Sequence, residues 1–130
     1  MKFLLDTHCW LWLQTERGRF GPEFLETLAD PATQRYLSAA SVWEIAIKYA
    51  VGKLPLPESP AIYVPARMRL SRFAGLAITD THALAAAALP PHHRDPFDRV
   101  LVAQARIEGL TLVTADAMLE AYDVRMVRVR

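Results

Sequence analysis

Residues 95–114, DPFDRVLVAQARIEGLTLVT, contain a helix pattern, a glycine and a strand pattern in direct succession. Asp95 precedes Pro96 as an N-cap precedes the first helical residue, and Gly109 is placed to end the helix. The five residues after Gly109 are apolar or β-branched, which predicts a buried strand. A helix of about Pro96 to Glu108 that leads at once into a strand is typical of an α/β fold.

The rest of the chain repeats this alternation of short apolar runs and longer helical patterns. Three prolines predict a loop over 53–60, and Pro65 should limit or kink a further helix in the sixties. Other strands are expected at 2–5, 35–39, 76–78 and 124–129, and other helices at 7–16, 22–29, 41–51, 81–89 and 117–122. We therefore expect a mostly parallel central sheet with helices on both faces, formed by residues 1–130 as one domain.

Composition limits the class of protein. The chain has 130 residues, 52% of them hydrophobic, and a net charge of +1, which is typical of one compact domain. Its one cysteine, Cys9, excludes an internal disulfide and suits a reducing compartment. Asp6 and His8 interrupt the first apolar stretch before it reaches signal-peptide length, and no segment approaches the roughly 18 apolar residues of a membrane span. We expect a soluble, unprocessed, cytoplasmic protein.

The basic residues do not by themselves indicate whether the protein binds nucleic acid. The chain carries twelve arginines and three lysines, and a guanidinium suits both phosphate contacts and ordinary surface ion pairs. Electrostatic binding depends on local patches, so the near-neutral sum excludes little. The best candidate for a basic face is the group Arg67, Arg69 and Arg72, although surface ion pairs are the more ordinary role.

Four carboxylates fall where an α/β protein builds its sites, which is beyond the carboxyl ends of the strands. Asp6 follows the first strand, where burial would leave its carboxylate in need of a partner. Asp116 lies just past the strand that follows Gly109, and Glu44 and Asp98 fall in the first turns of their predicted helices. All four are therefore candidates to face one cleft.

Local structural roles are available for most of these acids. Glu44 lies three residues after Ser41, the spacing of a capping box, and four before Lys48, the spacing of a helical ion pair. Asp98 suits the positive end of a helix dipole, and Asp116 is placed to cap the short helix after it. Each of these three acids is explained locally without a ligand.

If the four carboxylates meet, their charges must be relieved. Two unit charges about 4 Å apart interact by roughly 4 kcal/mol at an effective dielectric of 20, so cations or raised pKa values are needed. An all-oxygen cluster selects a hard ion such as Mg²⁺ or Mn²⁺ rather than zinc. Such ions between carboxylates and a phosphodiester can activate water and stabilise the leaving oxygen, which predicts phosphodiester hydrolysis.

Four segments in this order resemble the PIN-domain ribonucleases of the VapC toxin type: LLDTHCWLW (4–12), SVWEIAIKYAVGKL (41–54), HRDPFDRVLVAQA (93–105) and LTLVTADAMLEAY (110–122). One such segment would be a weak signal, but together they extend over nearly the whole chain. The resemblance implies a PIN fold, in which a parallel sheet is flanked by helices. It also matches the family's acidic residues to Asp6, Glu44, Asp98 and Asp116.

The resemblance further implies an endoribonuclease that depends on Mg²⁺ or Mn²⁺ and acts as the toxin of a toxin–antitoxin pair. Its partners would be RNA, a cognate antitoxin and, as is common in the family, a second copy in a homodimer. By that match Asp6 and Asp98 are the first-choice metal ligands, and Glu44 and Asp116 complete the catalytic pocket as second choices.

Two hydroxyl side chains lie beside these acids. Thr7 and Thr114 could orient a water bound to the metal, although a hydrogen bond at a helix start or strand end is their more ordinary role. None of the histidines has the HExxH spacing of a zinc site, and we expect them at the surface or behind the metal ligands: His8, His82, His92 and His93.

Tryptophans lie on helices that are apolar nearly all round, so Trp10, Trp12 and Trp43 are expected in the core. One of them could instead line a groove for the antitoxin, because tryptophan is favoured at interface hot spots. No binding role is assigned to an individual tryptophan from the sequence.

Two other function classes remain open. A phosphoryl-transfer domain of the haloacid-dehalogenase or receiver type also places an aspartate after its first strand. The former needs a second aspartate two positions later, where this chain has His8, and the latter needs an acidic pair before the strand, where it has only Lys2. A non-catalytic PIN-like interaction module is the third class, and the full acidic set argues against it.

Overall fold

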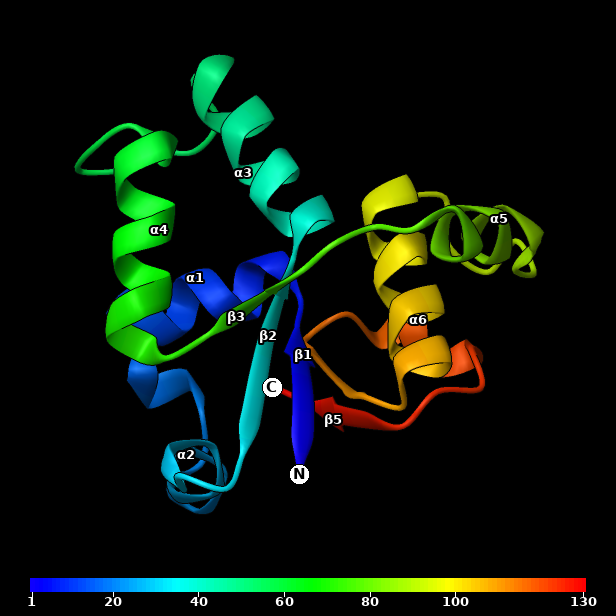
Figure 1. Cartoon of the computed structure of the whole chain (residues 1–130), viewed down its shortest axis with the longest axis horizontal. Helices are drawn as coiled ribbons and strands as arrows, with labels where there is room; N and C mark the ends of the chain where they lie inside the picture. Colours follow the sequence, from blue (N-terminus) through cyan, green and yellow to red (C-terminus); the bar gives the residue numbers. More distant parts are fainter.

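The computed structural model describes residues 1–130 and contains one five-stranded sheet (Figure 1). The strands lie in the order β3-β2-β1-β4-β5, and every neighbouring pair is parallel. Their bounds are β1 (Lys2–Leu5), β2 (Gln34–Ser38), β3 (Ala74–Leu76), β4 (Thr111–Thr114) and β5 (Met126–Arg128). The predicted α/β class with a mostly parallel sheet is confirmed.

Helices connect the strands and lie close to the positions that the sequence pattern predicts. They are α1 (Thr7–Thr15), α2 (Pro22–Ala29), α3 (Ala39–Ala50), α4 (Pro60–Ser71), α5 (Asp80–Ala88) and α6 (Pro96–Glu108), with short 3-10 segments η1 (Arg17–Arg19) and η2 (Ala117–Ala121). Pro65 does not end its helix, because α4 continues to Ser71. None of these helices combines the length and the apolar character that crossing a membrane requires.

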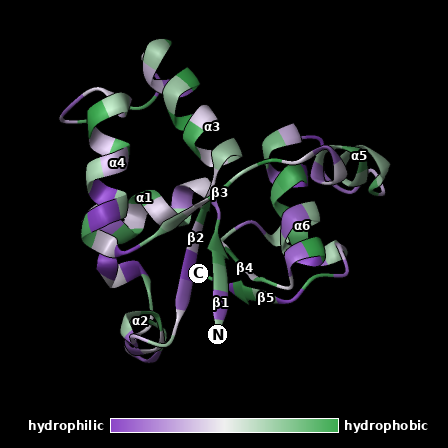
Figure 2. Cartoon of the chain, viewed as in Figure 1, coloured by the Kyte–Doolittle hydropathy of each residue, from purple (hydrophilic) through white to green (hydrophobic).

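Buried side chains lie on both faces of the sheet. Along β1, Phe3 and Leu5 belong to one apolar cluster and Leu4 to the other, and in β4 Val113 and Leu112 divide in the same way. This division explains why β1 is apolar at every position after Lys2 (Figure 2), since a strand covered on both faces has no side that faces water. Helices α1, α2, α3 and α4 contribute to the first cluster. The second contains residues of α6, Ala40 of α3 and Leu89, which directly follows α5.

The ends of α6 follow the sequence prediction. The Asp95 side chain accepts a hydrogen bond from the Phe97 N–H at 2.8 Å, and Pro96 occupies the first helical position. Gly109 has φ 68°, the left-handed conformation that closes a helix and that glycine adopts without steric cost. Asp95 is therefore the cap, and Asp98 lies in the first turn.

The start of α3 differs from the prediction. The helix begins at Ala39, directly after β2, and the cap is Ser38, whose hydroxyl accepts a hydrogen bond from the Ala40 N–H at 3.0 Å. Glu44 consequently lies in the second turn, and the predicted capping box with Ser41 is wrong. The apolar pattern does not mark this start because the first residues of α3 are small alanines.

Candidate active site

The carboxyl ends of β1 and β4 carry the first two candidate acids. Asp6 directly follows β1, is only 6% exposed, and caps α1 by accepting a hydrogen bond from the Cys9 N–H at 2.8 Å. Asp116 follows β4 after one residue and caps η2. Helices α3 and α6 bring Glu44 and Asp98 toward the same edge, where Asp98 is close enough to both Asp6 and Glu44 for their charges to affect its pKa.

The buried carboxylate of Glu44 has a partner for each of its oxygens. Its carboxylate accepts a hydrogen bond from the Thr7 hydroxyl at 2.6 Å, and its other oxygen pairs with the Lys48 ammonium at 2.6 Å. The predicted helical ion pair is therefore present. Because the glutamate is only 4% exposed, both partners offset the cost of burying its charge. Thr7 thus serves a side chain of α3, which differs from the local helix-start role expected of it.

Both carboxylate oxygens of Asp116 also have partners within the protein. One carboxylate oxygen accepts the Met118 N–H at 2.9 Å, and the other lies 2.7 Å from Nε2 of His93. Burial raises the pKa of Asp116, but these two partners outweigh it and hold the pKa below its usual range. The Thr114 hydroxyl accepts the Asp116 N–H at 3.0 Å, which is the strand-end hydrogen bond expected for that residue.

Asp98 is the carboxylate whose charge is least relieved. Burial, followed by the negative charges of Asp95 and Asp6, raises its pKa to about 7, and the opposing effect of His93 is smaller. The only ion-pair contact of Asp98 is with Nε2 of His93 at 3.2 Å. In the absence of a cation, Asp98 is therefore partly protonated near neutral pH.

Cys9 lies beneath Asp6 and is fully buried. Burial and the neighbouring Asp6 charge raise the pKa of its thiol far above the usual value, so the thiol stays protonated at any physiological pH. A protonated, buried thiol is a poor nucleophile.

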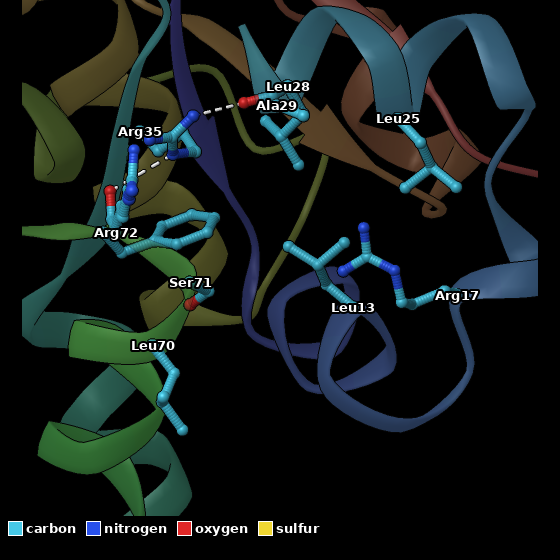
Figure 3. Close-up of a pocket in the computed structure, with 10 residues that line it drawn as sticks. Leu13, Arg17, Leu25, Leu28, Ala29, Arg35, Leu70, Ser71 and Arg72 are labelled. Atoms are coloured by element: carbon cyan, nitrogen blue, oxygen red, sulfur yellow. Dashed lines mark hydrogen bonds between the residues drawn. The ribbon is translucent and has the colours of Figure 1, made fainter. Parts of the chain in front are cut away.

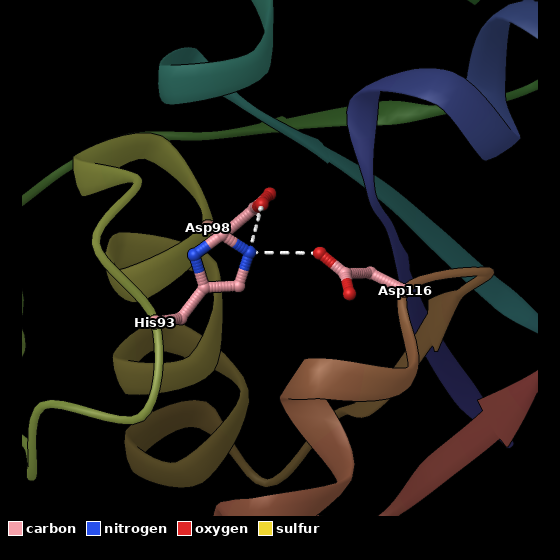
Figure 4. A group of neighbouring side chains, drawn as sticks. All are labelled: His93, Asp98 and Asp116. Atoms are coloured by element: carbon pink, nitrogen blue, oxygen red, sulfur yellow. Dashed lines mark hydrogen bonds and ion pairs between the residues drawn. The ribbon is translucent and has the colours of Figure 1, made fainter.

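His93 contacts two of the candidate acids, and the sequence alone did not distinguish it from the other three histidines expected at the surface or behind the metal ligands. Its imidazole lies between Asp98 and Asp116 (Figure 4), and these three side chains each bring one atom within 4.8 Å of the others. The signal in the sequence was its place two residues before the cap Asp95, at the edge where α6 begins. For His82 the prediction of a position at the surface or behind the metal ligands is wrong. Its side chain is buried in the fold and pairs with Glu108 at 2.8 Å.

The loop between α5 and α6 is held by Arg99 from the first turn of α6. Its guanidinium donates hydrogen bonds to backbone carbonyls at 2.8 to 3.2 Å, namely those of Ala86, Leu89, Pro90 and His93. Two longer contacts join the guanidinium to the Tyr122 hydroxyl at 3.3 Å and to the Ala87 carbonyl at 3.4 Å. Arg99 therefore determines where the backbone of His93 lies.

The arginines of the predicted basic face have different surroundings. Arg67 donates to the Gln14 side chain at 3.0 Å, whereas Arg69 is exposed. Arg72 ends α4 with φ 58° and lines a cavity of about 240 Å³ together with Arg17 and Arg35 (Figure 3). None of the four candidate acids lines this cavity.

Only Trp10 lies fully in the core, as expected of it. Trp12 is partly buried beneath the Arg19 guanidinium, 4.2 Å from the ring centre. Trp43 is 61% exposed, which corrects its predicted core position. It packs edge to face with Phe97 of α6 at 5.4 Å between ring centres, and most of its remaining surface faces solvent.

Comparison with known proteins gives the family. The model of the PIN domain matches residues 3–125. Ribonuclease VapC16 of Mycobacterium tuberculosis is 56% identical over 46 residues, which are 35% of this chain and 33% of that protein, so the match spans about a third of the relative's length.

Solved structures resemble the fold over its full length. VapBC2 of Rickettsia felis, bound to a DNA fragment from its promoter, has a TM-score of 0.74 at 17% identity and covers 100% of both chains. DNA-bound VapBC of Salmonella typhimurium has a TM-score of 0.71 at 20% identity and covers 98% of both. The family resemblance inferred from four segments is confirmed, and the other phosphoryl-transfer families are excluded. The chain belongs to the PIN domain family.

Proposed function

We propose that this chain is a metal-dependent endoribonuclease of the VapC type, the toxin of a toxin–antitoxin pair. The observation that carries the proposal is the cluster of acids at the carboxyl edge of a PIN fold, where Asp98 lies beside His93 and Asp116 and close to buried Asp6. The match to a ribonuclease VapC segment supports RNA as the substrate. The VapBC structures support an antitoxin as the partner, and a homodimer in the cytoplasm follows from the family resemblance alone.

The residues of the site fit a hard divalent ion. Asp6 and Asp98 are the proposed ligands, because Glu44 and Asp116 already have partners for both carboxylate oxygens. Carboxylate oxygens suit Mg²⁺ and Mn²⁺. When bound, such an ion supplies an activated water and stabilisation of the leaving oxygen of the phosphodiester.

The protein's own groups prepare the site for a phosphodiester. Glu44 is held by Lys48 and Thr7, and the pKa of Asp116 lies below its usual range, so both carboxylates add negative charge around the two ligands. This charge attracts a divalent cation but repels RNA, so the metal-free site is poorly suited to bind substrate. Metal binding is therefore expected to precede RNA binding.

RNA cleavage by the purified chain tests the proposal. We expect structured or single-stranded RNA to be cut in Mg²⁺ or Mn²⁺ and to survive in EDTA, as followed on denaturing gels. Asp6→Asn keeps an oxygen that can cap α1 but lacks the charge of a ligand, so its activity should fall at least about 100-fold. Cleavage that persists in EDTA, or that Asp6→Asn leaves undiminished, would exclude the metal mechanism.

The affinity for Mn²⁺ is expected to depend on pH through Asp98. Its pKa of about 7 means that protons compete with the cation below neutrality, so the Kd should rise by roughly tenfold per pH unit below pH 7 and level off above it. Electron paramagnetic resonance titrations of free Mn²⁺ from pH 5.5 to 8.5 measure this. An affinity that is constant across this range would contradict the assignment of Asp98 as a ligand.

A further inference from the structure

The His93 residue is fixed from three directions before any ligand binds. Its backbone N–H donates to the Tyr122 hydroxyl at 3.0 Å, and its carbonyl accepts from the Arg99 guanidinium at 3.2 Å. Its ring Nδ1 accepts the backbone N–H of Asp95 at 3.1 Å. Both the position and the rotation of the imidazole are therefore set by neighbouring groups.

The Asp95 amide also decides which ring nitrogen carries the proton. A neutral imidazole has one donor and one acceptor nitrogen, and Nδ1 is the acceptor because it faces an N–H. Nε2 is thus the donor, and it lies 2.7 Å from Oδ2 of Asp116 and 3.2 Å from Oδ2 of Asp98. A nitrogen that carries hydrogen cannot bind a metal through its lone pair, so His93 is not a metal ligand in this arrangement despite its closeness to both acids.

We propose that His93 is a positioning residue of the metal site, an inference that rests on the proposed function. Its Nε2–H holds the carboxylates of Asp98 and Asp116 at a fixed distance from each other (Figure 4). The two acids come from different elements, α6 and the segment after β4, and His93 is the side chain that contacts both. The donor limits the rotation of Asp116 and reduces the repulsion between two negative groups. Asp98, the proposed ligand of the pair, keeps its further lone pairs for a cation.

Two substitutions of His93 test separately the donor at Nε2 and the acceptor at Nδ1. In His93→Gln the side-chain amide nitrogen lies as many bonds from the backbone as Nε2 does, so a donor can reach the acids. In His93→Asn an oxygen can still accept the Asp95 N–H near the position of Nδ1, but no donor reaches the acids. Hydrogen-bonded groups behind metal ligands typically contribute about 10- to 100-fold to metal affinity. We therefore expect asparagine to weaken Mn²⁺ binding about tenfold and glutamine to restore it to within about threefold.

Calorimetric titration of MnCl₂ at pH 8 into the full chain and the variants His93→Gln, His93→Asn and Asp98→Asn tests the proposal, with circular dichroism to verify folding. If His93→Asn binds Mn²⁺ as tightly as the unchanged protein, or more tightly, the positioning role is overturned while the metal site stands. If the unchanged protein binds no better than Asp98→Asn, the metal site itself is wrong and the role of His93 falls with it.

The proton on His93 gives a readout that does not depend on affinity. Long-range ¹H–¹⁵N spectra of the metal-free chain, with His93→Gln used for assignment, should show a protonated Nε2 and a bare Nδ1. Saturating Mg²⁺ is expected to leave that tautomer unchanged. Loss of the Nε2 proton on addition of Mg²⁺ would make His93 a ligand and overturn the proposal.

Discussion

Asp98→Asn is expected to abolish RNA cleavage and, at the same time, to stabilise the metal-free protein. Cleavage should fall at least about 100-fold, because the neutral amide is a poor ligand for a hard divalent ion. Stability should rise because burial and then the charges of Asp95 and Asp6 raise the pKa of Asp98 to about 7. The buried charge of Asp98 is needed for cleavage but destabilises the folded protein, so Asp98→Asn should change activity and stability in opposite directions.

The sign of the stability change depends on pH. The pKa of Asp98 in the folded chain lies above that of an unfolded aspartate, so the folded state binds the proton more tightly and loses stability as pH rises from about 4 to 7. At pH 8 the penalty is on the order of 2–4 kcal/mol, and it is nearly absent at pH 4. Urea unfolding in EDTA at pH 5 and pH 8 should show a larger gain for Asp98→Asn at pH 8.

Asp95→Asn is the matched control, because it removes a charge three residues away. Asparagine caps a helix about as well as aspartate, so the hydrogen bond to the Phe97 N–H and the stability of α6 should be retained. Cleavage should stay within a few-fold of the unchanged protein. If Asp95→Asn and Asp98→Asn lose activity to the same extent, the division between cap and metal ligand in this motif is incorrect.

Replacing Arg99 with alanine is expected to destabilise the fold by at least about 3 kcal/mol. The guanidinium donates to five backbone carbonyls at the end of α5 and in the loop after it, and contacts the Tyr122 hydroxyl. Hydrogen bonds from a charged donor contribute roughly 1.5–3 kcal/mol each, and the carbonyls left behind lose their partner. Because the same loop carries His93, Mn²⁺ affinity should fall together with the free energy of unfolding.

Arg99→Lys separates charge from geometry. A lysine ammonium keeps the positive charge but cannot reach several carbonyls at once, so it should recover only a minor part of the lost stability. Urea unfolding of both variants, followed by Mn²⁺ titration at a temperature where each is folded, measures the two effects. A loss below about 1 kcal/mol for Arg99→Ala would mean that water replaces the guanidinium and that the loop is held by other contacts.

Local patterns predicted the elements of the fold well because their causes are local. The sequence pattern places the five strands and all α-helices except α4 within two residues of their observed bounds, and Asp95, Pro96 and Gly109 mark the ends of α6. For α4 it predicts only a helix in the sixties, and it does not predict η1. The errors have equally physical origins. The start of α3 was misplaced because alanines carry no strong pattern, and Trp43 was assigned to the core because apolar character does not reveal which side of a helix is left uncovered.

The sequence by itself determined the α/β alternation, the caps of α6 and the presence of four acids just after strands or in the first two turns of helices. Only the tertiary structure decided which of those charges are relieved. The partners of Glu44 and Asp116 include Thr7, 37 residues from Glu44, and His93, 23 residues from Asp116. Asp98 is left with a pKa of about 7, because the balance of charge depends on distances through space that residue spacing along the chain does not contain.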